Sequence, residues 1–265
     1  MLKRYAVKLY YDGKNFYGFQ LQKDRRTIAG EIFSAFVRSK LIVKPENAFF
    51  QVASRTDRGV SALGQTIAFN TEEKFSLKRI NAFLPPDMYA WAWVEVPLNF
   101  NPRREAEERT YVYVYPYKGE NLEKMKKAAK ILKENLVFGS YMGGDGKVYP
   151  RTLKDLSLTL TGECILFSFT SKSFVRGLVR KLTNLLLKVG QEKFSLNQLN
   201  QNLNYENLKQ KIPPAPAENL LLLEVKYGFK FNVDENSKKK LLDRFRGDLC
   251  LAQLKNICLR KLASI

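Results

Sequence analysis

The sequence predicts an α+β fold built from two related halves. Segments with strand-like alternation and segments with helix-like periodicity follow one another along the chain, and the same order of elements occurs twice. The helices lie between strands that look antiparallel, which favours α+β architecture. A third observation is size, because 265 residues suffice for one large domain or two of ordinary size with a substantial core.

The first half begins with a strand and a capped helix. Residues 5–13 alternate in character and end at an Asp-Gly turn, which predicts a strand. Thr27 is suited to cap a helix over residues 28–37, where apolar side chains recur at helical spacing. The other predicted elements of this half are strands at 48–54, 64–71 and 89–96 and a short helix at 76–84.

The second half follows a polar connector at residues 99–108. Its first strand, residues 109–117, carries tyrosines at alternate positions, hence on one face. Its strongest helix, residues 173–189, has leucines at the spacing of a buried stripe. The other predicted elements are a helix at 121–135, strands at 152–161, 163–171 and 219–229, and a proline-rich linker at 213–216.

These elements divide the chain into three parts. We expect an N-terminal α/β half over residues 1–104, a C-terminal α/β half over residues 105–229 and a basic helical extension over residues 230–265. The extension is rich in lysine and has leucines in a helical pattern. It is expected to face RNA or a second copy of the chain.

Composition indicates a cytoplasmic protein with a polyanionic partner. Forty-five Lys and Arg against 26 Asp and Glu give a net charge of +19, which attracts polyanions, although a cell with generally Lys-rich proteins would give the same excess. No apolar run approaches the ~18–20 residues that span a bilayer, and the first residues lack the features of a signal peptide. The three cysteines are scattered, as reduced structural thiols are.

Histidine is absent from the chain. This excludes catalytic triads that use histidine, zinc sites that need it and imidazole general bases. Any chemistry must therefore depend on Asp, Glu, Lys, Tyr, Cys or Ser side chains, or on a bound cofactor.

The segment SRTDRG places Asp57 between Arg55 and Arg58. Nearby guanidiniums keep a carboxylate ionised, so that it can serve as a nucleophile or as an ion-pair anchor. Gly59 and Gly64 would let a ligand approach the backbone closely. A solvated ion pair on a surface loop has the same sequence pattern, and the residues alone leave catalysis and structure equally open.

Two further features could belong to the same site. Arg176 and Arg180 are four residues apart and are predicted to share one face of the apolar helix. A buried arginine needs an acidic partner, and Asp57 is the best candidate. The tyrosine face that begins at Tyr111 could stack on RNA bases or could simply pack in the core.

The segment SRTDRGVSALGQ resembles the active-site motif of the TruA-type tRNA pseudouridine synthases. Ser54 and Ser61 stand where bacterial members usually have Gly and His, so the motif is more similar to archaeal and eukaryotic members. The likeness covers residues 4–228. The other segments that follow the family in order are residues 11–22, 27–32, 84–88, 100–117, 172–190 and 213–225.

The resemblance implies a role for each residue of the motif. Asp57 would be the nucleophile that attacks a flipped-out uridine, and Tyr111 would stack on the target base. Arg180 matches the family arginine that pairs with the catalytic aspartate. Arg55 and Arg58 would lie against the RNA backbone or the phosphate of the extruded nucleotide.

The resemblance also implies the fold, the substrate and the partners. We expect a pseudouridine synthase fold, with a mixed central sheet from two similar ferredoxin-like halves and a positive cleft between them, usually as a homodimer. The expected target is a uridine in the anticodon stem-loop of tRNA, at tRNA positions 38–40, and Arg25 and Arg26 lie in the loop that the family uses against tRNA. Isomerisation creates no net charge, so neither a metal nor another cofactor is expected.

Three alternatives remain at this stage. The protein could be a non-catalytic RNA-binding module that uses the Tyr111 strand as a stacking platform. It could be a pseudouridine synthase that acts on other tRNA uridines. It could also be a hydrolase that cleaves the glycosidic bond with two carboxylates, for which the sequence offers no second acid in a recognisable motif.

Overall fold

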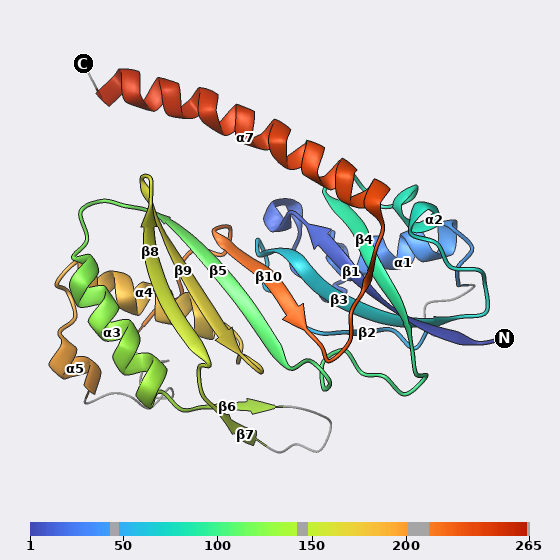
Figure 1. Ribbon diagram of the computed structural model, residues 1–265, viewed down its shortest axis with the longest axis horizontal. Coiled ribbons are helices and arrows are strands. Elements are labelled where there is room, and N and C mark those ends of the chain that lie inside the picture. Colours follow the sequence, from blue (N-terminus) through green and yellow to red (C-terminus); the bar gives the residue numbers. More distant parts are fainter. Residues whose placement is uncertain (43–47, 142–147, 201–211, 264–265) are drawn as a thin grey trace.

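The fold is built on one mixed β-sheet, seen face-on in the computed structural model (Figure 1), which describes residues 1–42, 48–141, 148–200 and 212–263. Its strands lie in the order β11-β4-β1-β3-β10-β5-β9-β8, with β2 paired to β3 beside this order. These strands are β1 (Lys3–Tyr11), β2 (Gln51–Val52), β3 (Ser61–Thr71), β4 (Met88–Val96), β5 (Glu108–Pro116), β8 (Asp155–Thr161), β9 (Cys164–Ser171), β10 (Leu220–Lys226) and β11 (Asn232–Val233). A separate hairpin pairs β6 (Phe138–Tyr141) with β7 (Val148–Arg151).

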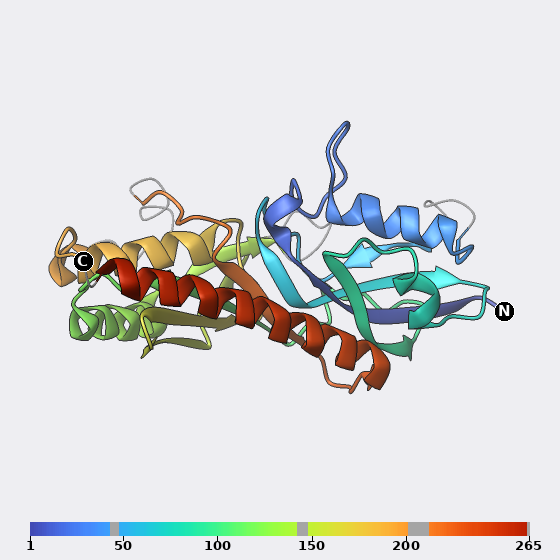
Figure 2. The ribbon, with the colours of Figure 1, turned by 90° about the horizontal axis from the view of Figure 1, so that it is seen from above.

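Helices cover this sheet unevenly. The two helices α1 and α4 lie on the same side of the sheet, and the loop between η1 and α1 projects from that side (Figure 2). Thr27 caps α1 as the sequence predicts, because its side chain accepts a hydrogen bond from the Gly30 amide. The helices are η1 (Gly13–Asn15), α1 (Ile28–Arg38), α2 (Leu77–Asn81), α3 (Leu122–Asn135), α4 (Leu178–Gly190), α5 (Leu196–Asn200) and α7 (Glu235–Ala263).

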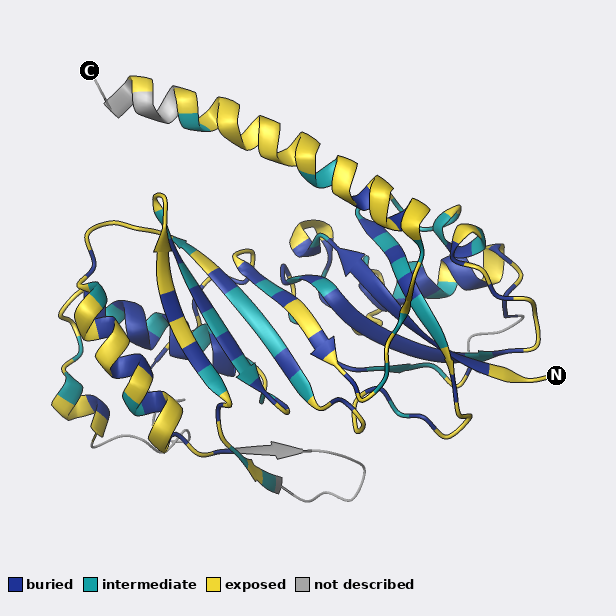
Figure 3. Cartoon of the chain, in the orientation of Figure 1, coloured by how far each residue is buried: buried dark blue, intermediate teal, exposed yellow. Residues whose placement is uncertain are grey.

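The strand β1 is buried along almost its whole length (Figure 3). It lies between β3 and β4, so its backbone is paired on both edges. Its second face is covered by side chains from the end of the chain: Phe231 lies over the Lys8 ammonium, and Phe245 of α7 packs edge-on against Tyr10. The alternation seen in the sequence therefore does not correspond to one solvated face, because polar and apolar side chains of β1 are both covered.

Two hydrophobic clusters pack against the sheet. One gathers residues of the first half with the end of β10, and the other gathers α3, α4 and the strands of the second half. The ring of Tyr111 packs against both clusters. The two sets of strands are joined where β3 and β10 run parallel, in the register Leu221 to Ser61 and Leu222 to Ala62.

Gly64 lies at this junction and not against a ligand. A Cβ atom at Gly64 would lie 2.5 Å from the Leu223 carbonyl oxygen and 2.6 Å from the Glu224 Cα. The expectation that Gly64 admits a ligand is therefore wrong. The glycine admits the neighbouring strand.

Two predicted elements differ in the structure, and some observed elements were not predicted. The strand expected at 48–54 is reduced to β2, and the chain after it forms an irregular loop up to β3. The helix expected at 173–189 begins only at Leu178, because Gly177 before it has a left-handed backbone (φ +74°). The hairpin of β6 and β7, the short helix α5 and the strand β11 were not predicted.

The last helix, α7, extends away from the body of the protein (Figures 1 and 2). Its first turns pack on β4, and Leu241 there is buried. Farther along, Leu249, Leu251 and Leu254 are each 60% exposed. No helix within the described ranges is both long and apolar enough to cross a membrane.

Candidate active site

Asp57 lies on the loop between β2 and β3, where the two sets of strands meet. Backbone hydrogen bonds fix this loop from two sides: the Phe19 amide donates to the Thr56 carbonyl (3.1 Å), and the Val60 amide donates to the Asp57 carbonyl (3.2 Å). Gly59 follows with a left-handed backbone (φ +83°), which a residue with a Cβ rarely adopts. The loop thus presents the Asp57 side chain from a fixed backbone.

A buried hydrogen-bond network supports this loop from below. The Tyr11 hydroxyl bonds the Thr56 hydroxyl (2.8 Å), and the Gln65 amide nitrogen donates both to Tyr11 (3.1 Å) and to the Ser54 carbonyl (2.7 Å). Burial raises the pKa of Tyr11, so its hydroxyl stays protonated. A satisfied polar network in a low-dielectric interior is rigid, and this one holds the residues on the N-terminal side of Asp57.

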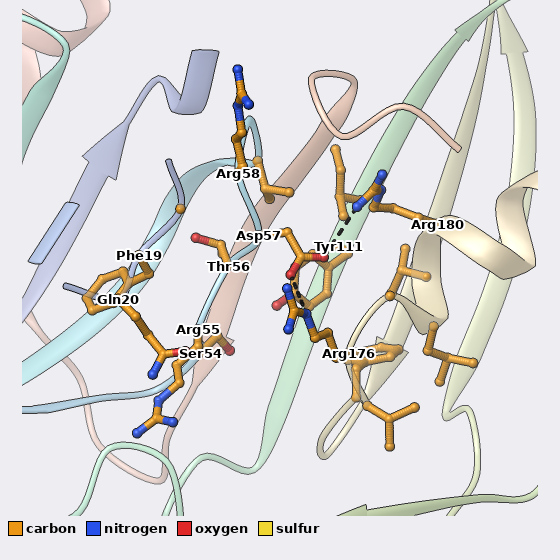
Figure 4. A pocket seen from close by; sticks show the side chains of 18 of the residues that line it. Phe19, Gln20, Ser54, Arg55, Thr56, Asp57, Arg58, Tyr111, Arg176 and Arg180 are labelled. Atoms are coloured by element: carbon orange, nitrogen blue, oxygen red, sulfur yellow. Dashed lines mark hydrogen bonds and ion pairs between the residues drawn. The ribbon is translucent and has the colours of Figure 1, made fainter. Parts of the chain in front are cut away.

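The Asp57 carboxylate lies between two guanidiniums from the far side of the cleft (Figure 4). Its Oδ2 is 3.3 Å from Nη1 of Arg180, and its Oδ1 is 3.2 Å from Nε of Arg176. The expected contact between Asp57 and Arg180 is therefore present. The side chains of Asp57 and Arg180 are 22% and 19% exposed, so the pair is partly buried.

Arg180 and Arg176 differ in how far solvent reaches them. Arg180 lies in the first turn of α4, and its Nε donates to the Ala215 carbonyl at 2.6 Å. Arg176 precedes the helix in the turn that ends at Gly177, and its side chain is 93% exposed. The prediction that Arg176 and Arg180 share a helix face is wrong, yet the two arginines still converge on Asp57 from different backbones.

Tyr111 lies in β5 at the bottom of the same cleft. Its ring meets the Phe174 ring edge-on, with 5.3 Å between centroids. Burial raises the pKa of the Tyr111 phenol, which hydrogen bonds with Ser54. The Tyr111 hydroxyl therefore stays protonated. Its partly covered ring lies beside Asp57 in the cleft, where a ligand could contact it (Figure 4).

The flanking arginines of the motif point away from Asp57 in opposite directions (Figure 4). Arg58 lies over the ring of Tyr17, with its guanidinium carbon 4.4 Å from the centroid, and Arg25 lies over the same ring at 4.6 Å. Arg55 is exposed on the other side. Tyr17 was not predicted from the sequence, but it gathers Arg25 and Arg58 into one exposed cationic cluster.

Arg26 is used within the protein. Its guanidinium donates to both carboxylate oxygens of Asp87, at 2.8 and 2.9 Å, and to Glu31 at 2.7 Å. Hydrogen bonding to Asp87 is the main cause of the raised pKa of Arg26. These carboxylates pair with the charge of Arg26, which we expected to contact tRNA. They attach the loop before α1 to α1 itself and to the start of β4.

Arg109 is a further site residue that the sequence did not predict. It is 3% exposed, and its guanidinium donates to the carbonyls of Ala53, Arg103 and Lys172 and to the Ser54 hydroxyl. It thus joins the Asp57 loop to β5 and to the segment before α4. The available signal was its position two residues before Tyr111, on the buried face of an alternating strand.

Asp57, Tyr111 and several arginines line one cavity of about 540 Å³. Among the described residues that line it, Asp57 is the one carboxylate. The cavity has six arginines along its walls: Arg55, Arg58, Arg103, Arg109, Arg176 and Arg180. Such a site favours an anionic ligand. The part of the chain that the structure describes contains no group of three or more Cys, Asp or Glu placed to hold a metal ion.

Comparisons with known proteins show which proteins the chain is similar to. A family model described as tRNA pseudouridine synthase matches residues 135–228. A tRNA pseudouridine synthase A of Methanosphaera stadtmanae is 31% identical over 94% of this chain and 94% of its own length. Proteins of the same name from Methanosarcina mazei (35% identity, 93% of this chain, 97% of that protein) and Pyrococcus abyssi (34%, 95% and 97%) are similar over the same extent.

Proposed function

The chain belongs to the tRNA pseudouridine synthase family, and we propose that it isomerises a uridine in the anticodon stem-loop of tRNA with Asp57 as the nucleophile. The family makes it an isomerase that modifies tRNA. The target position and the role of Asp57 are our proposal. The observation that carries it is the single carboxylate in a cavity lined by six arginines, with the Tyr111 ring beside it.

The reaction needs the uridine to leave its stack. The bond between the sugar C1′ and N1 of the base breaks, the base turns, and a bond from C1′ to C5 forms. C5 then gives up a proton and N1 gains one, so the product has the same composition and charge as uridine. Asp57 would form a transient bond to the nucleotide, while Tyr111 stacks on the base and offsets part of the cost of extrusion.

Arg180 would position the nucleophile. Its hydrogen bond to the Ala215 carbonyl fixes the guanidinium, and its hydrogen bond to Oδ2 of Asp57 orients the carboxylate in the cavity. Arg58 and Arg55 extend to the two sides of Asp57, where they could bind the phosphates before and after the extruded uridine (Figure 4).

The cavity disfavours a two-carboxylate hydrolase. Glycosidases of that kind need a second acid within roughly 5–10 Å of the first. The described lining of this cavity offers Asp57 alone. A non-catalytic RNA-binding module is disfavoured for another reason, since RNA binding by itself gives no use for a carboxylate aimed into a basic cleft.

The experiment that tests this proposal is the mapping of pseudouridine in bulk tRNA after incubation with the purified protein. We expect new pseudouridine in the anticodon stem-loop. Product confined to another arm of tRNA would disprove the proposed target while leaving the enzyme class intact. Free uracil in place of pseudouridine would indicate hydrolysis.

We further propose that the protein acts in the cytoplasm as a homodimer. The far part of α7 exposes Leu249, Leu251, Leu254 and Ile257, and a helix with apolar side chains on most sides is normally covered. A second copy of the chain is the partner that is always present at matching concentration. Sedimentation of the full chain tests this, since a monomer at micromolar concentration would contradict it.

A further inference from the structure

A second hollow, of about 400 Å³, adjoins the candidate active site. It is lined by the side of α1 and by the segment that leads into β2. Phe19, Gln20, Arg55 and Arg103 line both this hollow and the cavity of Asp57. The two spaces therefore adjoin along one edge, and Gln20 and Arg55 point toward that edge, away from Arg180 (Figure 4).

The floor of the second hollow is aromatic. Phe33 of α1 and Phe50 before β2 are both partly exposed, and their ring centroids are 4.8 Å apart at an angle of 61°. The other apolar residues of the lining are Phe19, Leu21, Ala29 and Val52. Aromatic faces that stay partly exposed beside a basic edge are typical of surfaces on which unstacked nucleic-acid bases lie.

The edge shared with the active site is cationic. Arg55 and Arg103 both line it. Burial is the main cause of the lowered pKa of Arg103, and the positive charge of Arg55 adds to it. Two guanidiniums held near each other repel, and an anion between them relieves that repulsion. A phosphodiester group has the charge and the acceptor oxygens that arginine pairs bind.

We propose that this hollow is a second-nucleotide subsite, which holds the unstacked base of the nucleotide directly adjacent to the target uridine. This inference rests on the proposed function. One phosphate links two adjacent nucleosides, so with the uridine beside Asp57 the strand continues through the shared edge. The linking phosphate lies at Arg55 and Arg103, and the neighbouring base stacks on Phe33 and Phe50.

The subsite has a consequence for the energetics of extrusion. An adjacent base that leaves the helix no longer stacks on the target, so the target uridine loses one of its own stacking partners before it turns. The cost of unstacking the neighbour is offset by stacking on phenylalanine, which is indifferent to base identity because every base has a π face. We therefore expect the enzyme to accept any base at this position.

The test uses anticodon-arm RNA hairpins that carry the target uridine and lack the base on its 5′ or on its 3′ side. We expect one of these abasic RNAs to lose roughly tenfold to a hundredfold in kcat/KM with the wild-type enzyme, from lost stacking. Phe33→Leu keeps most of the apolar volume but removes the ring. Its kcat/KM on intact RNA is expected to fall by a similar factor, whereas on that abasic RNA it is expected to equal the kcat/KM of the wild-type enzyme. Phe83→Leu, a half-buried phenylalanine elsewhere, serves as the control.

A second pair of variants keeps the test independent of packing. Arg103→Gln is expected to weaken binding of both intact and abasic RNA, whereas Arg104→Gln, at an exposed arginine outside both hollows, leaves binding unchanged. If both abasic RNAs react at the rate of intact RNA and Phe33→Leu has no effect, the subsite is wrong while the proposed function stands. If the wild-type enzyme forms no pseudouridine in intact RNA, the proposed function fails and the subsite with it.

Discussion

The Asp57 carboxylate keeps about a fifth of its surface in contact with solvent, and this sets the strength of its pairing with Arg180. Fully exposed pairs are worth about 0–1 kcal/mol, and breaking a fully buried pair costs about 3–5 kcal/mol. This pair lies between the two limits. The second guanidinium, that of Arg176, is almost fully in solvent and adds little to stability.

Replacement of Arg180 by Gln tests this difference. We expect Arg180→Gln to lower the free energy of unfolding by about 1–3 kcal/mol, because it removes a partly buried partner and the hydrogen bond to Ala215. The matched variant Arg176→Gln is expected to change it by less than about 1 kcal/mol. Denaturant unfolding measures both, and equal losses would show that exposure does not decide the strength of the two contacts.

At this scale the sequence predicted the partner of Asp57 but not the full environment. The pairing with Arg180 could be anticipated, because an arginine on an otherwise apolar helix needs an acid. The approach of Arg176 could not, since it depends on the left-handed backbone of Gly177, which shortens the helix. The roles of Asp57, Tyr111, Arg55 and Arg58 in catalysis and RNA binding stay predictions.

At the scale of elements, the junction of β3 and β10 holds the two sets of strands together. The backbones approach most closely at Gly64, where a Cβ would lie within 3 Å of Leu223 and Glu224 backbone atoms. The position of Asp57 relative to Arg180 depends on this junction, because the two residues belong to elements on its opposite sides.

Gly64→Ala is therefore expected to destabilise the protein by about 1–3 kcal/mol, since a backbone cannot move aside as a flexible side chain can. The control is Gly247→Ala in α7, where an added Cβ would meet nothing within 4 Å. That change is expected to stabilise the helix by about 0.5–1 kcal/mol or to have no effect. Thermal unfolding of both variants measures these changes in stability. A Gly64→Ala protein as stable as wild type would contradict the close packing of β3 and β10.

The positions of the helices and strands along the chain were largely predictable from the sequence. Which strands pair with one another was not. Alternation and helical spacing located β1, α1, β5 and α4 to within a few residues, apart from the late start of α4. The parallel pairing of β10 with β3 joins residues about 160 positions apart, and no local pattern specifies such a register. For this reason Gly64 was assigned to a ligand. The division at residues 104 and 229 also stays a prediction.

At the scale of the whole molecule, the net charge of +19 has a defined place to act. Six arginines line the cavity of Asp57, and Arg25 joins them at its side because it lies over the ring of Tyr17, which also lines the cavity. Phosphates bound there would release counterions, so the logarithm of tRNA affinity is expected to fall with the logarithm of salt by about 0.7–0.9 for each phosphate.

Arg25→Ala is expected to reduce the magnitude of that slope by roughly one. It is also expected to lower the affinity for tRNAs of different sequence equally, because phosphate contacts do not read bases. Arg26→Ala serves as the contrast. Its charge is already paired with Asp87 and Glu31, so we expect a loss of stability and an almost unchanged slope. Titrations of each variant with tRNA at several salt concentrations measure the slope. A slope that changes in Arg26→Ala but not in Arg25→Ala would show that Arg26, and not Arg25, contacts phosphate.

The proposed reaction depends most on Asp57 acting as the nucleophile. The most direct measurement is pseudouridine formation by Asp57→Asn and Asp57→Ala, with tRNA binding measured on the same preparations. The control is Asp155→Asn, a partly exposed aspartate on β8 that pairs with Lys133. We predict no product above background from either Asp57 variant, tRNA affinity within about tenfold of wild type because phosphate contacts dominate it, and full activity in the control. Measurable turnover by Asp57→Ala would contradict the claim.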